Sequence, residues 1–150
     1  MDFDFSERHY ASSDFVLDER KLQKGDILIN STGVGTAGRV TLFNLDGDFV
    51  VDSHITIFRP NEKVLPKYAL YSLANIGFDT IEKMANGSSG QIELSLSTIE
   101  NISFLIPPLS TQHKIVAEIE GYEAEIAKAK TIMDGCAARK QEILSRIIQN

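Results

Sequence analysis

Apolar and polar residues alternate in short runs before Pro60 of this 150-residue chain, a pattern typical of β-strands. A Lys-Gly-Asp turn precedes three consecutive apolar residues, Ile27 to Ile29, and glycines follow, which predicts a short buried strand. Residues 38–44 and 48–60 are rich in β-branched and aromatic side chains, and an Asp-Gly pair lies between them. Because Asp-Gly favours the tight turns of hairpins, we expect these two segments to form a β-hairpin.

The middle of the chain changes to helical spacing. Between residues 65 and 85 the apolar positions recur every three or four residues, so we expect two short helices divided at Gly77. The next apolar segment predicts a short strand, a turn or helical step near Ser97–Glu100, and a last strand that ends at Pro107. Together these elements predict an α+β domain in residues 1–108, built on a small mixed sheet with short helices.

The C-terminal part, residues 109–150, has the clearest periodicity. Starting at Ile115, ten positions recur at alternating steps of four and three, and nine of them are apolar or aromatic. These positions, called the seam below, are Ile115, Ile119, Tyr122, Ile126, Ala129, Met133, Cys136, Lys140, Ile143 and Ile147. A 3.5-residue repeat predicts a long coiled-coil helix of about 55 Å that needs a second helix, in a dimer or a longer chain. We expect Ser110 or Thr111 to cap it; the alternative is a helix broken at Gly135 that packs on its own domain.

Composition is typical of a cytoplasmic globular protein. Hydrophobic residues make up 43% and charged residues 24%, and no apolar run approaches the length of a membrane span. The first residues are acidic and polar rather than signal-like. Cys136 is the only cysteine and the three histidines lack ligand spacing, so we expect neither an internal disulfide nor a metal site.

The net charge of −6 argues against a DNA-binding protein that acts alone, because Lys and Arg contacts to phosphate normally supply most of the affinity. Residues 1–106 have nine basic and fifteen acidic residues, whereas residues 107–150 have six of each. If DNA is the ligand, another protein must help to hold it.

Residues 33–38, GVGTAG, match the glycine pattern of dinucleotide-binding proteins. In those proteins a helix follows the glycines, and its N-terminus receives the pyrophosphate. Here the following residues, 39–44, are strand-like, which argues against nucleotide binding. Two interpretations stay open: a loop whose backbone N–H groups approach phosphate, or simply a tight turn.

Polar residues around this glycine loop, and in a second polar loop at residues 86–91, have the chemistry to contact DNA phosphates or base edges. Gln91 is of the residue type that recognises adenine through two hydrogen bonds. The candidate DNA-binding residues are Asn30, Ser31, Thr32, Gly33, Gly35, Thr36, Arg39, Ser88, Ser89 and Gln91. The alternative for each of them is that it only satisfies backbone groups of its own loop.

The sequence indicates no catalytic site. Asp52, Ser53 and His54 are the residue types of a hydrolase triad, but neighbouring strand positions point to opposite faces, so Ser53 would point away from the other two. No P-loop, Cys-His nucleophile or paired-carboxylate motif is present in the sequence. We therefore expect a protein that is not an enzyme.

Three ordered segments carry a family resemblance. LQKGDILINSTGVGTAGRV, VDSHITIFRP and GSSGQIELSLSTIENISFLIPPLSTQHKIVAEIE resemble successive signature segments of the specificity subunits of type I restriction-modification systems. The resemblance covers about residues 20–148. Its specificity comes from the order of the glycine loop, the D-S-H strand, the G-S-S-G-Q loop and the P-P-L-x-x-Q helix start.

The resemblance implies a target recognition domain that reads half of a split DNA sequence, followed by a helix that pairs antiparallel with its counterpart and sets the half-site spacing. It also implies partners. Two methyltransferase subunits would help to enclose the DNA, bind S-adenosylmethionine and methylate adenine, and a restriction subunit can join them. This chain would then hold no cofactor of its own.

The chain is shorter than a complete specificity subunit of that family, which has two recognition domains and two spacer helices. It also has fewer residues before the K-G-D segment than one such domain usually has. A truncated gene product, a half-size subunit that dimerises and an excised fragment are all compatible with this length. The functional alternative is a coiled-coil assembly or dimerisation module that does not read DNA.

Overall fold

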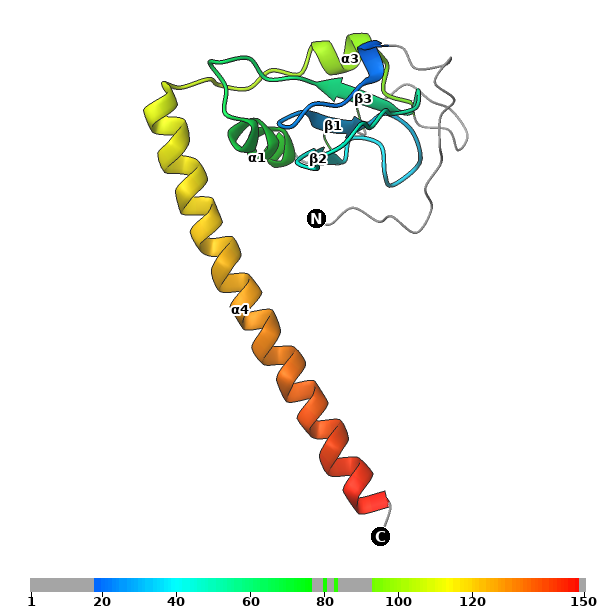
Figure 1. The fold of residues 1–150 in the computed structure, drawn as a ribbon, viewed down its shortest axis with the longest axis vertical. Helices are drawn as coiled ribbons and strands as arrows, with labels where there is room; N and C mark the ends of the chain where they lie inside the picture. Colours follow the sequence, from blue (N-terminus) through cyan, green and yellow to red (C-terminus); the bar gives the residue numbers. More distant parts are fainter. Residues whose placement is uncertain (1–17, 77–79, 81–82, 84–92, 149–150) are drawn as a thin grey trace. The chain divides into compact units, whose positions relative to one another are not determined.

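The computed structural model describes residues 18–76, 80, 83 and 93–148. Within them it shows the expected α+β fold, which combines a small sheet, short helices and one long C-terminal helix (Figure 1). The chain divides into two compact units, Met1–Gln112 and His113–Asn150.

The sheet has three strands, β1 (Ile27–Asn30), β2 (Val40–Leu42) and β3 (Ile55–Phe58), in the order β2-β1-β3 (Figure 1). A mixed sheet was the expectation, and every pairing between the described strands is antiparallel. Ile27 and Ile29 of β1 are fully buried, which confirms the prediction of a short buried strand. Leu28, which points to the opposite face, is half-buried, so both faces of β1 are covered at least in part and its apolar residues can be consecutive.

The predicted hairpin is wrong. Strands β2 and β3, which the hairpin was to pair, are not neighbours, because β1 lies between them. The predicted second strand, 48–60, is also shorter than expected, since β3 covers only its last part. The side chain of Asp52 accepts a hydrogen bond from the His54 amide at 2.9 Å, and this Asx-type turn interrupts the strand. Upstream of the turn, Val50 forms only an isolated bridge with Lys21.

Helix α1 (Pro66–Ile76) confirms the first predicted helix and lies against the sheet (Figure 1). Proline at its first position suits a helix start, because the amide that it lacks has no partner there. Tyr68, Ala69 and Leu73 form the buried face of α1 and complete the core with Ile27 and Ile29 of β1. The predicted second helix after Gly77 lies almost wholly outside the described residues.

The short helix α3 (Leu96–Glu100) confirms the predicted helical step, and the side chain of Ser95 caps it. A single-turn helix η2 (Asp18–Arg20) lies at the start of the described chain. The predicted last strand is wrong, because residues 102–108 form no strand. Their carbonyl groups accept hydrogen bonds from side chains instead: Tyr68 Oη donates to Leu105 O, and Gln112 Nε2 donates to Pro107 O, both at 2.8 Å.

Gln112 is fully buried and bonds three separate backbone groups. Its Nε2 donates to Lys63 O and Pro107 O, and its Oε1 accepts from Leu65 N, all at 2.8 Å. The P-P-L-x-x-Q sequence therefore has a structural explanation. Its glutamine joins the segment before α1 to the segment before the long helix.

Helix α4 (Leu109–Ile148) has 40 residues and would extend about 60 Å. It begins before Ser110 and Thr111, so the prediction that one of them caps it is wrong; the carbonyl of Pro108 accepts from the amides of Thr111 and Gln112 instead. The alternative of a break at Gly135 is also wrong, because the helix is continuous there. The prediction of a long helix through this region is confirmed.

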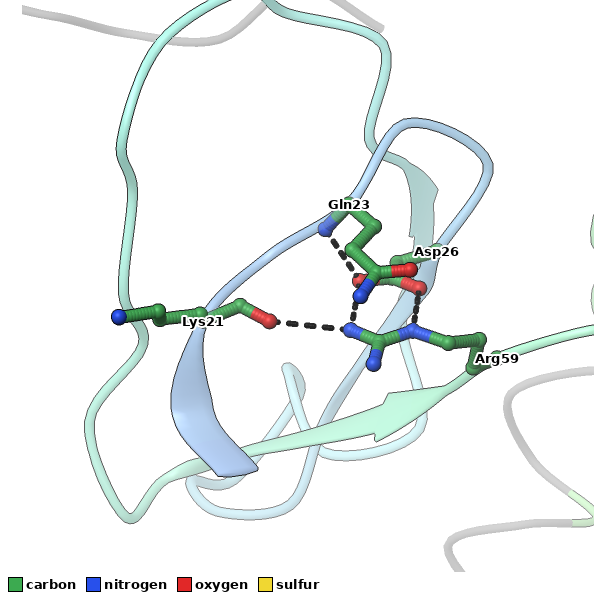
Figure 2. Close-up of polar contacts among 4 residues, drawn as sticks. All are labelled: Lys21, Gln23, Asp26 and Arg59. Carbon is green, nitrogen blue, oxygen red and sulfur yellow. Dashed lines mark hydrogen bonds and ion pairs between the residues drawn. The ribbon is translucent and has the colours of Figure 1, made fainter. Parts of the chain in front are cut away.

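An ion pair between the buried Asp26 and the partly exposed Arg59 joins the start of β1 to the end of β3, at one end of the sheet (Figure 2). The Asp26 carboxylate, 1% exposed, accepts from Arg59 Nε at 2.7 Å, from Arg59 Nη2 at 2.8 Å and from the Gln23 amide at 2.7 Å. Arg59 also donates to Lys21 O at 3.0 Å. The hydrogen bond to Asp26 raises the pKa of the Arg59 guanidinium above its ordinary value, so the guanidinium stays charged.

We expect Arg59→Ala to lower the free energy of unfolding by about 2–4 kcal/mol, because it leaves a buried carboxylate without its cation. The exposed pair Lys24–Asp46, with side chains 56% and 91% exposed, is the matched control. Breaking it with Asp46→Asn should cost less than about 1 kcal/mol. Urea unfolding followed by circular dichroism measures both, and equal effects would contradict a special role for the buried pair.

Candidate nucleic-acid interface

The glycine loop, residues 31–38, connects β1 to β2 and is closed by its own backbone. The amides of Thr36 and Ala37 donate to Gly33 O, and the amide of Gly38 donates to Asn30 O at 2.7 Å. Gly33, Gly35 and Gly38 have positive φ angles of 95°, 74° and 86°, a region that side chains disfavour. β2 follows the loop directly, which confirms the argument against a dinucleotide-binding helix.

At the tip of the loop some amides have no partner in the described structure. Within the described part of the chain, the amides of Gly33, Val34 and Gly35 make no hydrogen bond, and Val34 is 61% exposed. The tight turn is thus confirmed for part of the loop, and the approach of its backbone N–H groups to phosphate stays a prediction. Its second half is a tight turn, and its tip presents three consecutive backbone donors of the kind that can approach phosphate.

Several candidate side chains hold the loop rather than face solvent. Ser31 is buried, and its hydroxyl lies 2.8 Å from that of Thr56. The Oδ1 atom of Asn30 accepts from the Thr32 amide, and the Thr36 hydroxyl donates to Thr32 O at 3.1 Å. The side chains of Asn30 and Thr36 thus satisfy loop backbone, which was the alternative given for them, whereas the Ser31 hydroxyl contacts β3.

Arg39 and Asn30 form the exposed polar end of the sheet. Asn30 and Arg39 lie opposite each other, since the Asn30 amide donates to Arg39 O at 2.9 Å, and Ile55 is the partner of Asn30 on the other side. Directly opposed residues of antiparallel strands point to the same face, so Arg39 and Asn30 are neighbours on one face. The guanidinium of Arg39 is exposed and makes no hydrogen bond or ion pair with a described residue.

His54 is a member of this group that the sequence did not suggest. Its Nδ1 lies 3.2 Å from the Thr32 hydroxyl, and its carbonyl accepts from the Ser31 amide at 2.7 Å. The only sequence signal was the D-S-H run, which predicted a strand and was used to exclude a triad. The Asp52 carboxylate bonds the backbone amide of His54, not its ring, and this geometry is not that of a catalytic triad.

Residues 93 and 94, which follow the second polar loop in the sequence, lie beside the glycine loop. Its candidates Ser88, Ser89 and Gln91 lie outside the described residues. The chain that follows them is held firmly: Glu93 forms a bridge with Thr32, and the amide of the buried Leu94 donates to Ser31 O at 2.8 Å. The structure thus places Glu93 and Leu94 against the start of the glycine loop.

A hydrophobic cluster lies beneath the glycine loop. Ala37 of the glycine loop and Leu94 are buried together, with Ile76, Ile99 and Ile102 packed against them. The glycine loop is therefore supported by residues of α1 and α3. A supported loop presents its tip in one conformation, which recognition of a fixed partner requires.

Comparison with known proteins decides the family. A family model described as the type I restriction modification DNA specificity domain matches residues 16–133, which is most of the chain. The chain belongs to this family. A Haemophilus influenzae protein named as a type I restriction enzyme specificity subunit is 33% identical over 107 residues, covering 67% of this chain. The specificity domain described here spans 25% of the length of that relative.

Two further observations concern the described residues of this specificity domain. None of the described helices is both long enough and apolar enough to cross a membrane. Among the same residues, no group of three or more His, Cys, Asp or Glu side chains is arranged to hold a metal ion.

We expect Gly33→Ala to destabilise the specificity domain more than Gly35→Ala does. Both changes place a side chain at a positive φ, which costs about 1–2 kcal/mol. A Cβ at Gly33 would also lie 2.5 Å from Thr36 Oγ1, whereas a Cβ at Gly35 meets nothing within 4 Å. Unfolding free energies of the two variants measure the difference.

The Thr36→Ala background isolates the steric part of this effect. Without the hydroxyl, Gly33→Ala should cost only about as much as Gly35→Ala costs in the wild type, roughly 1–2 kcal/mol. An equal penalty for Gly33→Ala in both backgrounds would show that the contact with Thr36 is not the cause.

Proposed function

We propose that this chain is the DNA sequence-recognition module of a type I restriction-modification specificity subunit. In this role it directs partner methyltransferase subunits, and the restriction subunit where one joins, to a DNA half-site. The observation that carries the proposal is the family match, which covers both the glycine-loop unit and more than half of α4. We therefore treat the glycine-loop unit and the long helix as parts of one functional module.

The polar end of the sheet supports DNA as the ligand. Arg39 supplies an exposed cation, Asn30 supplies an amide next to it, and the tip of the glycine loop supplies backbone donors. Arginine and backbone amides bind phosphate, and arginine and asparagine also hydrogen-bond base edges. Thr32 and His54 extend the same surface toward the start of β3.

The shortage of positive charge supports action within a complex. The whole chain has 15 basic residues and a net charge of −6. Of these basic residues, the described interface contains Arg39. Arg20 lies nearby and donates a hydrogen bond to Asp52 O. A protein that binds DNA by itself normally neutralises several phosphates. Methyltransferase subunits would supply the remaining basic surface, the S-adenosylmethionine and the chemistry, while this chain supplies the sequence preference.

A second candidate function rests on α4. Large apolar residues of this helix are exposed, among them Ile126 and Met133, as expected of a helix that pairs with another. The chain could then act mainly as an assembly or dimerisation module that does not read DNA. The two functions differ in what a change at Arg39 does.

We expect Arg39→Gln to weaken binding of a complex between this chain and a cognate methyltransferase to its target DNA. Loss of one phosphate contact should reduce the slope of log K against log salt concentration by about 0.9. The measurement is fluorescence anisotropy with labelled DNA at several salt concentrations, and the methylated adenines are then mapped.

Lys24→Gln is the matched control, since Lys24 is an exposed cation that precedes β1, at the opposite end from the glycine loop. It should leave both the affinity and the salt dependence unchanged. If Arg39→Gln and Lys24→Gln behave alike while the complex still assembles, DNA recognition by this surface is wrong and the assembly function is favoured.

A further inference from the structure

The turn that leads into β3, residues 52–54, is held by its own backbone and by Arg20. The Asp52 carboxylate accepts from the His54 amide at 2.9 Å, and the Asp52 carbonyl accepts from the Arg20 guanidinium. The carbonyl of His54 accepts from the Ser31 amide at 2.7 Å. None of these bonds uses the His54 ring. The turn therefore fixes the place of this side chain without occupying its nitrogens.

The imidazole ring of His54 is held through one of its two nitrogens. Its Nδ1 lies 3.2 Å from the Thr32 hydroxyl. The side chain is exposed, and its Nε2 has no hydrogen-bond partner within the described part of the chain. A ring bonded at Nδ1 directs Nε2 away from that partner, and Nε2 is a donor or an acceptor according to the tautomer. His54 thus presents one polar atom, in a defined place, to a ligand.

Two carboxylates neighbour this ring. Asp52 is exposed, and its bond to the His54 amide uses one of about four acceptor positions of the carboxylate. Glu93 is also exposed and forms a bridge with Thr32, so their Cβ atoms lie about 5 Å apart. Arg20 offsets part of this charge, but it donates to the carbonyl of Asp52 and not to its carboxylate. The His54 side of β1 is therefore more acidic than basic.

The other side of β1 has the opposite charge. At the end of this strand, the Asn30 amide donates to Arg39 O, and the Ser31 amide donates to His54 O. Because neighbouring strands lie about 5 Å apart, Arg39 and His54 flank β1 with about 10 Å between their backbones. Arg39 is exposed and directly follows the glycine loop. Positive and negative groups are thus separated across the end of β1.

This separation decides which groups of DNA each side can bind. A phosphate is attracted by a guanidinium and repelled by carboxylates. The amino groups of bases, N6 of adenine and N4 of cytosine, are donors in the major groove, and acidic side chains can accept from them. Purine N7 is an acceptor that an imidazole N–H can bond. The Arg39 side is therefore suited to the DNA backbone, and the His54 side to base edges.

We propose that His54 and Asp52 read a base edge in the major groove of DNA, while Arg39 and the tip of the glycine loop contact phosphates. This inference rests on the proposed function and deepens it. It assigns sequence selection to two residues that the sequence did not suggest as DNA contacts. Both side chains come from one fixed turn, so they meet the same base pair or two adjacent ones.

The alternative for Asp52 is that it only holds the turn. Asparagine makes the same turn, because its side-chain oxygen also accepts from the backbone amide two residues on. An Asp52→Asn change therefore keeps the turn and replaces one acceptor oxygen by an NH₂ donor. This change separates base reading from a structural role.

We expect His54→Asn to reduce discrimination about tenfold at one base pair of the half-site, or at two adjacent ones. Asparagine keeps a polar group near Thr32 but has no atom in the place of Nε2. The slope of log K against log salt concentration should stay that of the wild type, because no phosphate contact is lost. Fluorescence anisotropy on complexes with a cognate methyltransferase measures both. The probes are duplexes with the target mapped for the wild type and duplexes in which each of its base pairs is replaced in turn.

His113→Asn is the matched control, since His113 is an exposed histidine of α4 outside the first unit, Met1–Gln112. It should leave discrimination at every base pair unchanged. Equal weakening of His54→Asn on all duplexes would show that His54 contacts the DNA backbone, and would overturn the inference. Full wild-type affinity and discrimination in the His54→Asn complex would overturn it as well. Circular dichroism and co-purification with the methyltransferase verify that each variant is folded and assembled.

We expect Asp52→Asn to reduce discrimination about tenfold at the same base pair or the next one, because its NH₂ group would face the amino group of the base. Asp46→Asn is the same chemical change at a side chain that is 91% exposed and pairs with Lys24, and it should leave discrimination unchanged. The same duplexes measure both variants. If Asp52→Asn binds every duplex more tightly by one factor, the carboxylate faces phosphate. If its binding is unchanged, Asp52 only holds the turn. Each of these two results overturns base reading by Asp52.

The failure of this inference and that of the proposed function are distinguishable. A wild-type complex that binds all duplexes alike would contradict the proposed function itself. A different pattern would contradict only the inference: the wild type discriminates among the duplexes, Arg39→Gln has a shallower salt dependence, and His54→Asn keeps full discrimination.

Discussion

The buried carboxylate of Asp26 needs the cation of Arg59, and the first unit, Met1–Gln112, depends on this constraint. We call this unit the recognition unit below. Asp26 directly precedes β1 and Arg59 directly follows β3, so their two hydrogen bonds fix how these strands align. A strand that slips by one residue turns every side chain to the other face. The same alignment places Asn30 beside Ile55 and Arg39 at the far end of the sheet. An ion pair at one end thus positions the candidate interface at the other.

Within the interface, the polar groups divide into those that hold the loop and those that remain for a ligand. The hydroxyls of Ser31 and Thr36 are used inside the protein, whereas Arg39 and the amides at the loop tip face outward. So few outward groups can select a sequence but supply little affinity. The net charge of −6 also means that this chain supplies little affinity for DNA. We therefore assign the affinity for DNA to a complex and only the selection to this chain.

Periodicity predicted the elements well, because helices and buried strands repeat locally. It predicted α4, α1 and β1, and the glycine loop was correctly distinguished from a nucleotide site by the strand that follows it. It failed on strand order, because an Asp-Gly pair reports only on its own turn and not on which strands pair across the sheet. The bonds of Arg59 to Asp26 and of Gln112 to Lys63 span 33 and 49 residues, and no local pattern encodes them. The contact of the Ser31 hydroxyl with the Thr56 hydroxyl could not be predicted for the same reason.

The long helix follows a different physical rule from the recognition unit. The recognition unit is held by specific hydrogen bonds of fully buried groups such as Asp26 and Gln112. The helix leaves large apolar residues such as Ile126 and Met133 exposed, and four of the six charged residues in its first half are acidic while four of the six in its second half are basic. A lysine at a seam position, here Lys140, costs a coiled coil stability but can specify its register. Buried polar groups thus hold the first unit from within the chain, whereas the exposed apolar residues give α4 a surface of the kind that coiled-coil helices bury in pairs.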